Sequence, residues 1–456
     1  MQLPTAFIQA TQEILGNEYP SFEASLREES PVSIRLNRNK NGISSGSEKV
    51  VWCDTGYYLK ERPLFTADPL FHAGCYYVQE ASSMFLEQVI RQIVRSPITA
   101  LDLCAAPGGK STHLSALLPA GSLLVSNEII RSRAHILAEN LCKWGNPARI
   151  VLQSTPEAIG RANRLFDLIV TDVPCSGEGM FRKDPASIDE WSPENVKLCV
   201  ERQRNILRDI WPALKPGGFI VYSTCTYNTL ENEDNIAWIA EELGAQAVSL
   251  SIPEEWNISP NVKGSLPSYR FFPHRTQGEG FFMAVLQKEE EEESASRSSG
   301  KVKKGKERTK QSVAPAPGSV KDWLSDSSSF HFFTKENEVY AIPALHKEIL
   351  NTLEQSLHPL HPGIHLCSIK GKDLIPSQQL ALSTALHKGA FPSYEIDKAT
   401  ALQYLSKEAI TSLPADLPKG YLLLTYQKQA LGFVKNIGNR ANNLYPQEWR
   451  IRMKLH

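Results

Sequence analysis

Between residues 98 and 286 the chain alternates short apolar runs, rich in β-branched residues, with longer amphipathic segments. Runs that are apolar throughout and separated by helices are typical of a mostly parallel sheet covered on both faces. The pattern therefore predicts an α/β fold, in which ligands bind beyond the carboxyl ends of the strands. The predicted strands are residues 98–103, 122–126, 148–152, 166–171, 218–223 and 281–286.

A helix is expected soon after the strand at 218–223. Asn228 and Glu231 have the spacing of a capping box. Apolar residues then recur at helical spacing at Ile236, Ile239 and Leu243. The strand should therefore lead directly into a helix N-terminus.

The amino-acid composition changes along the chain and indicates where globular domains are separated by a linker. With 456 residues, 41% hydrophobic and 22% charged, it is long enough for two or three globular domains. A glutamate run at 289–293 opens a Ser- and Lys-rich segment that cannot bury a core, so a flexible linker is expected at 289–319. Its lysines could touch RNA phosphates, although a solvated tether is the favoured role. The predicted domains are 1–95, 96–288 and 320–456.

Charge, hydropathy and cysteine content argue against several classes of protein. A net charge of −1 gives no overall argument for nucleic-acid binding, which would need local basic patches. The chain shows no long apolar run for a membrane span and no secretory signal pattern. Its eight cysteines form no C-x-x-C pair, which argues against a zinc knuckle or a disulfide framework. We expect a cytoplasmic monomer with reduced thiols, no membrane contact and no metal.

A glycine-containing loop follows the first predicted strand. Small residues let the backbone approach a ligand, and the start of a helix offers free N–H groups. A Walker A motif is disfavoured because Cys104 stands where that motif needs its first glycine. Tight packing alone is the other interpretation. The residues of this predicted cofactor loop are Cys104, Ala105, Ala106, Pro107, Gly108, Gly109 and Lys110.

Glu128 follows the second predicted strand, about 20 residues beyond the loop. At that position an acidic side chain can accept hydrogen bonds from ribose hydroxyls, although capping the next helix is an equally good interpretation. Arg133 lies one turn further on, as a second cofactor contact or a surface charge.

Two cysteines follow two other strands. Cys175 comes after Asp172 and a proline, in a Gly/Ser loop beyond the fourth strand, and Cys225 directly follows the fifth strand. Post-strand loops of one parallel sheet meet at one edge, so the two thiols should share a crevice. Arg182 and Lys183 could contact phosphates or simply keep the loop solvated.

This set matches the chemistry of methylating carbon 5 of cytosine. A thiolate that adds to carbon 6 makes carbon 5 nucleophilic toward an electrophilic methyl group. A carboxyl group such as that of Asp172 can stabilise charge on the ring, and a second thiol can assist release. The base must leave its stack to reach such a site.

The motifs LDLCAAPGGKS, NE, TDVPCSGEGMFRKD, LKPGG and YSTCTYNTLENE resemble the NOL/NOP2/Sun family of RNA cytosine-5 methyltransferases. SGEGMFRKD, GCYYVQEASSMF and FVKNIGNRANNLYPQEWRIRM favour its bacterial RsmF-type branch, which acts on small-subunit (16S) ribosomal RNA. The resemblance covers residues 3–286 and 320–456.

The resemblance implies a Rossmann-like class I methyltransferase sheet that binds S-adenosyl-L-methionine. It further implies an N-terminal α+β lobe that helps grip RNA, covering about residues 1–95 with residues 34–37 inside it, and a C-terminal PUA-like RNA-binding module. Cys225 would be the nucleophile and Cys175 would help release the product. The loop 104–110, Glu128 and Asp172 would contact the cofactor, with Arg133 as an additional contact. Residues 153–156 depart from the family by lacking its usual acidic residue on the adenine side.

The end of the chain supplies the local basic patch. Tyr445 and Trp449 lie among its cations, a combination suited to structured RNA, although packing around Trp449 is an alternative. The cations are Lys428, Lys435, Arg440, Arg450, Arg452 and Lys454, of which we expect Arg440, Arg450 and Arg452 to bind RNA.

The expected partner is ribosomal RNA or the small ribosomal subunit. Two other hypotheses stay open: a catalytically silent RNA-binding or ribosome-assembly factor, and a DNA cytosine-5 methyltransferase in which Cys175 attacks. Loss of a covalent adduct with 5-azacytosine RNA on replacing Cys225, and its retention on replacing Cys175, would separate them.

Overall fold

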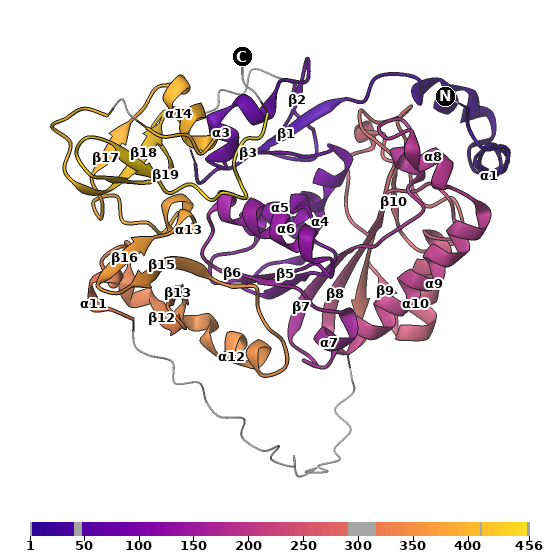
Figure 1. The fold of residues 1–456 in the computed structure, drawn as a ribbon. Coiled ribbons are helices and arrows are strands. Elements are labelled where there is room, and N and C mark those ends of the chain that lie inside the picture. The colour runs from indigo at the N-terminus through magenta and orange to yellow at the C-terminus, as the bar shows by residue number, and fades with distance from the viewer. Residues whose placement is uncertain (1, 41–47, 291–315, 411–412, 454–456) are drawn as a thin grey trace, which may run out of the picture.

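The computed structural model describes residues 2–40, 48–290, 316–410 and 413–453. Most of the predicted linker, residues 291–315, and Lys454 lie outside the described residues. Figure 1 shows a central sheet with an N-terminal lobe above it and the C-terminal part packed along one side. None of the helices described combines the length and apolar character needed to cross a membrane.

The central sheet contains nine strands among the described residues, and all six predicted strands are present. Along the sheet the order is β10-β11-β8-β7-β4-β5-β6-β14, with β9 paired to β11. The strands β4 to β8 run parallel, whereas β11 is antiparallel to β8. The bounds are β4 Thr99–Asp102, β5 Leu123–Asn127, β6 Arg149–Leu152, β7 Phe166–Asp172, β8 Leu214–Thr224, β9 Ala245–Ala247, β10 Tyr269–Phe271, β11 Phe281–Lys288 and β14 His361–Pro362.

Helices cover both faces of this sheet, as the uniformly apolar strands predicted. One core joins α4, α5 and α6 to one face, and a second core joins α7, α9 and α10 to the other. Every residue of β4, β5 and β6 is buried. The bounds are α4 Leu86–Ile93, α5 Gly109–Leu117, α6 Arg131–Trp144, α7 Pro156–Gly160, α8 Ala186–Glu190, α9 Pro193–Ile210 and α10 Glu233–Leu243.

The N-terminal lobe is a three-stranded antiparallel sheet with short helices. Its first two helices pack against aromatic residues of the central domain, among them Phe181 and Tyr227. The lobe is therefore fixed to the loops that follow β7 and β8. The bounds are α1 Thr5–Leu15, α2 Tyr19–Ser25, β1 Val32–Leu36, β2 Gly56–Leu59, α3 Pro69–His72 and β3 Tyr76–Val78.

The C-terminal part contains two four-stranded sheets and shares cores with the rest of the chain. Leu350 and Leu353 pack into one of the two cores of the central sheet. Tyr404 and Val434 pack with Ile34 of the N-terminal lobe in a separate core. The bounds are α11 Gly318–Lys321, β12 Phe330–Lys335, β13 Glu338–Pro343, α12 Lys347–Ser356, β15 Ile364–Lys370, β16 Asp373–Pro376, α13 Gln378–Leu382, β17 Ser393–Glu395, α14 Lys398–Leu405, β18 Gly420–Tyr426, β19 Gln429–Asn436 and β20 Ala441–Asn443.

Candidate active site

Two thiols meet at the carboxyl edge of the central sheet. The strands β7 and β8 are parallel neighbours in which Asp172 is aligned with Ser223. Cys175 lies in the loop after β7, and Cys225 directly follows β8. The two Sγ atoms are 3.2 Å apart, which confirms that the cysteines converge.

The surroundings of Cys175 keep its thiol protonated. The Cys225 backbone N–H donates to the Sγ of Cys175 at 3.4 Å. The side-chain hydrogen bond with Cys225 and burial together raise the pKa of Cys175 well above its usual value, and Glu231 adds to the shift. At neutral pH the Cys175 thiol can therefore donate its hydrogen to the sulfur of Cys225.

Two buried carboxylates, not anticipated from the sequence, hold the cysteine loops together. The Glu231 carboxylate accepts the backbone N–H of Ser176 at 3.0 Å. The Glu178 carboxylate accepts the backbone N–H groups of Tyr227 at 2.7 Å and Asn228 at 2.9 Å. Each carboxylate thus joins the loop after β7 to the loop after β8. Only the three-dimensional pairing of these loops distinguishes the two glutamates from surface charges.

The predicted helix N-terminus beside Cys225 is wrong. Asn228 Oδ1 does accept the backbone N–H of Glu231, at 2.9 Å, but α10 begins only at Glu233. The Glu231 carboxylate turns toward Ser176 instead of closing a capping box. The loop after β8 therefore lengthens, and no helix begins at Cys225.

A cavity of about 310 Å³ opens beside Cys225, near the lower end of the range of about 300–1,000 Å³ for small-molecule sites. Gly108 adopts φ +115°, which favours glycine, and lets the chain turn into α5. Cys175 is absent from the cavity wall. The lining residues include Cys104, Ala105, Ala106, Pro107, Gly109, Lys110, Asp172, Lys183, Cys225 and Phe281.

Lys110 and Asp172 form an ion pair on this wall. Lys110 Nζ lies 2.9 Å from Asp172 Oδ2 and 4.9 Å from the ring centre of Phe281. Ser223 Oγ donates to the other oxygen of Asp172 at 3.0 Å. The carboxylate is 40% exposed, so it is oriented by two partners and still accessible to a ligand.

Glu128 and Arg133 do not line the cavity. Glu128 is buried and accepts the backbone N–H of Ile130 at 3.0 Å, within the turn before α6, so it does not cap that helix, which has no side-chain cap. Arg133 lies 3.4 Å from Glu128 and donates to the carbonyl of Ala106 at 3.0 Å. In this structure the pair supports the loop, and its contact with a cofactor stays a prediction.

Asp102, which was not predicted as a site residue, lies directly before the loop 104–110 and does not line the cavity. It ends β4, is fully buried, and has its pKa raised to about 7 by burial. Ser111 Oγ donates to Oδ2 at 2.6 Å, whereas Oδ1 has no partner among the described residues. Its place immediately before the predicted cofactor loop is the signal in the sequence that could have singled it out.

The N-terminal lobe supplies part of the wall through Tyr77, Gln79 and Glu80. Arg35, in the lobe that is expected to help grip RNA, is fully buried and donates to Gln79 at 2.7 Å and to Thr112 at 2.6 Å. This arginine therefore fastens the lobe to α5. Nothing in its local sequence distinguished that role from a surface contact.

The five predicted RNA contacts fall into two groups. Lys183, Arg440, Arg450 and Arg452 are exposed. Arg182 is instead buried, pairs with Glu279 at 3.0 Å and donates to the carbonyl of Gly278 at 2.7 Å. The predicted phosphate contact of Arg182 is therefore corrected to a structural bridge, because its guanidinium is enclosed and already paired.

Comparison with known proteins identifies the family. Residues 95–287 match the family described as 16S rRNA methyltransferase RsmB/F, residues 3–81 match the N-terminal domain of 16S rRNA methyltransferase RsmF, and residues 391–451 match the methyltransferase RsmF PUA domain. Ribosomal RNA small subunit methyltransferase F of Salmonella arizonae is 30% identical over 476 residues, covering 98% of this chain and 96% of the relative. The chain belongs to the RsmF family.

Other comparisons agree with this RsmF assignment. The Serratia proteamaculans ribosomal RNA small subunit methyltransferase F is 28% identical over 468 residues, covering 98% of this chain and 96% of the relative. A methyltransferase homolog from Pyrococcus horikoshii has 26% identity and a TM-score of 0.54, covering 62% of this chain and 95% of that one. NSun6 from Pyrococcus horikoshii with SFG shares the fold, with 19% identity and a TM-score of 0.54 over 63% and 99% of the two chains. The central sheet is thus the Rossmann-like sheet of a methyltransferase.

Proposed function

We propose that this RsmF-family chain methylates carbon 5 of a cytosine in small-subunit ribosomal RNA. S-adenosyl-L-methionine would be the methyl donor, and the reaction would pass through a covalent bond between Cys225 Sγ and carbon 6. The observation that carries the proposal is the 3.2 Å contact between Cys225 and Cys175 beside a cavity walled by the loop 104–110.

The cavity has the features that the cofactor needs. Its wall is made of small residues at Ala105 and Ala106, so the backbone can approach a ligand closely. Asp102 has a buried, unpartnered carboxyl oxygen just before this loop, and Lys110 adds a positive charge. When bound, S-adenosyl-L-methionine supplies an electrophilic methyl group. Asp102, the loop and Lys110 are the groups that we assign to holding it.

The assignment of the nucleophile follows from exposure to the cavity. Cys225 lines the cavity and Cys175 does not. The Cys175 thiol, protonated because its pKa is raised, can hydrogen-bond to the sulfur of Cys225 and stabilise its thiolate form. Cys225 then adds to carbon 6 of an extruded cytosine, and the electron pair of the 5,6 double bond moves toward carbon 5.

We assign Asp172 to the cytosine ring. Lys110 and Ser223 fix both of its oxygens, and enough of the carboxylate is exposed to face the N3 and N4 edge. A preorganised polar group at this edge stabilises the charge that develops on the ring while Cys225 adds, and so lowers the barrier to addition. Lys110 belongs to both halves of the site, because it lies in the cofactor loop and pairs with Asp172.

Release of the product reverses the addition. After methyl transfer, the proton on carbon 5 leaves to water, the electron pair re-forms the 5,6 double bond, and the bond from Sγ to carbon 6 breaks. Cys175 can donate its hydrogen bond to the departing thiolate of Cys225 across 3.2 Å. This division of roles gives each cysteine a separate step.

RNA would be held at two places. Lys183 is exposed on the rim of the cavity, close to where the flanking phosphates of an extruded base must pass. Arg440, Arg450 and Arg452 are exposed on the part of the chain that contains the PUA match. These side chains are the proposed phosphate contacts.

The test is methyl transfer in vitro with labelled S-adenosyl-L-methionine and three substrates: naked 16S ribosomal RNA, assembled small subunits, and single-stranded DNA of matching sequence. Bisulfite sequencing of the labelled nucleic acid locates the product. We expect 5-methylcytosine in one of the two RNA substrates and none in DNA. Labelling of DNA alone, or of no substrate, would contradict the proposal.

A further inference from the structure

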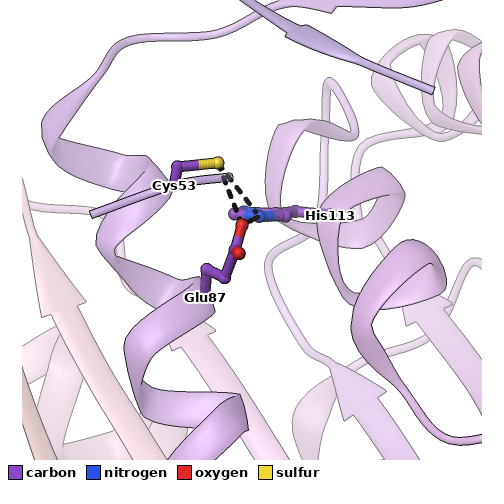
Figure 2. A group of neighbouring side chains, drawn as sticks. All are labelled: Cys53, Glu87 and His113. Carbon is purple, nitrogen blue, oxygen red and sulfur yellow. Dashed lines mark hydrogen bonds and ion pairs between the residues drawn. The ribbon is translucent and has the colours of Figure 1, made fainter. Parts of the chain in front are cut away.

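Three buried side chains, none of them used by the proposed mechanism, point toward one another. Cys53 lies between β1 and β2, Glu87 on α4 and His113 on α5 (Figure 2). Each is 1% exposed, and none lines the active-site cavity. Thiol, carboxylate and imidazole together are a donor set that suits zinc.

We propose that Cys53, Glu87 and His113 form a zinc site. Glu87 Oε2 lies 3.0 Å from Cys53 Sγ and 3.3 Å from His113 Nε2, and Sγ and Nε2 are 3.8 Å apart. Zinc bonds of about 2.3 Å to sulfur and about 2.0–2.1 Å to nitrogen and oxygen place tetrahedral ligands about 3.3–3.6 Å from one another. The three separations differ from these values by about half an ångström or less, so small movements would admit the ion.

The surroundings orient the same three atoms. Glu87 Oε1 is occupied by the backbone N–H of Asp54 at 3.2 Å and by Arg91 at 2.6 Å, which leaves Oε2 for a metal. His113 Nε2 faces the same Oε2 of Glu87, and a neutral imidazole is the form that binds metal. The Cys53 thiol would lose its proton to solvent on binding, and the His113 ring proton would move to Nδ1, which has no partner among the described residues.

The Cys53 thiolate and the Glu87 carboxylate would bring two negative charges to Zn²⁺, and the cation that already pairs with Glu87, Arg91, is also paired with Asp54. The fourth position would belong to water or to Thr55, whose Oγ1 lies 3.8 Å from Cys53 Sγ. The ion would join the N-terminal lobe to α5, the helix whose first residues, Gly109 and Lys110, line the cavity.

This site departs from the expectation of no metal. That expectation rested on the absence of paired cysteines, whereas here the ligands lie 34 and 26 residues apart in the chain. The competing arrangement is a metal-free triad in which Cys53 and His113 both donate to Glu87. The same distances fit that triad, so metal content must decide.

The experiment measures zinc by mass spectrometry in the full chain, expressed with added zinc and purified without chelator. We expect about one zinc per chain in the wild type and less than about one tenth in Cys53→Ser and in His113→Gln. Cys367→Ser, a buried cysteine in β15, is the matched control and should keep its zinc. Circular dichroism verifies that every variant is folded.

Cobalt provides a second readout that requires the cysteine. After chelation and addition of Co²⁺, the wild type should show tetrahedral d–d bands and a thiolate-to-cobalt charge-transfer band, and Cys53→Ser should lose the latter. Wild-type protein without stoichiometric zinc and without the charge-transfer band would overturn the proposal and establish the metal-free triad. Equal metal binding by wild type and both cluster variants would overturn it as well.

Discussion

Lys110 Nζ lies 2.9 Å from the carboxylate of Asp172, so one ion pair connects the start of α5 to the end of β7. The two residues belong to the two halves of the proposed reaction, Lys110 to the cofactor loop and Asp172 to the edge that would face the cytosine. Removing either charge should therefore disturb both halves of the site.

Asp172→Asn should lower kcat by about 100-fold, the order expected for losing one preorganised polar group at a reacting centre. The amide keeps the shape of the side chain but loses the charge that Lys110 pairs with. Single-turnover methylation measures the rate. Asp167→Asn is the matched control, because Asp167 lies on the same strand and pairs with Lys215 at 2.6 Å, outside the cavity. A similar loss in both variants would indicate a general effect on β7.

The two cysteines should respond differently to 5-azacytosine-containing RNA. Cys225→Ser should form no covalent adduct and show no turnover, because the attacking sulfur is gone. Cys175→Ser should still form the adduct and accumulate it, since release is slowed. Denaturing gels with labelled RNA measure both, and Cys367→Ser should behave as wild type. Adduct formed by Cys225→Ser but lost in Cys175→Ser would reverse the two roles.

Asp102 should make the protein less stable as the pH rises from about 4 to about 7. Its pKa is raised from 3.8 to about 7 by burial, so the folded state holds the proton while the unfolded state has lost it. Between pH 5 and pH 7 this effect amounts to about 2 kcal/mol of unfolding free energy. Asp102→Asn cannot titrate, so urea unfolding should show it gaining about that much relative to wild type. If the unfolding free energies of the two proteins changed with pH in parallel, the raised pKa of Asp102 would be contradicted.

Arg182 and Lys183 are adjacent but should have opposite phenotypes. Arg182→Ala leaves the buried carboxylate of Glu279 without its partner and should cost about 3–5 kcal/mol of stability. Lys183→Ala should leave the melting temperature unchanged and reduce the slope of log Kd against log salt by about 0.7–0.9. Thermal melts and RNA binding at several salt concentrations test both. A melting loss in Lys183→Ala with an unchanged salt slope would reject the proposed phosphate contact.

The sequence predicted the central sheet and the meeting of the cysteines because both follow from local rules. Apolar runs separated by helices indicate parallel strands, and residues after neighbouring parallel strands must share an edge. Cys175 and Cys225 needed no further information. The position of the loop 104–110 on the cavity wall was predictable for the same reason, since small residues between a strand and a helix leave room for a ligand.

The features of the site that the sequence did not predict depend on contacts between segments far apart in the chain. Arg182 resembles a surface charge in a polar loop until Glu279, 97 residues later, encloses it. Glu231 has the spacing of a helix cap, but Ser176 takes its carboxylate. Gln79 reaches the cavity only because the N-terminal lobe docks on α5. No local pattern records such pairings.

The two-residue strand β14 has a practical consequence for dividing this protein. His361 and Pro362 pair with β6 and occupy the outer edge of the central sheet. A fragment that stopped after β11 would leave β6 with unsatisfied backbone groups facing solvent, together with the apolar surface that α12 covers. Exposed strand edges recruit other chains, so such a fragment should aggregate even though its own helices and strands are intact.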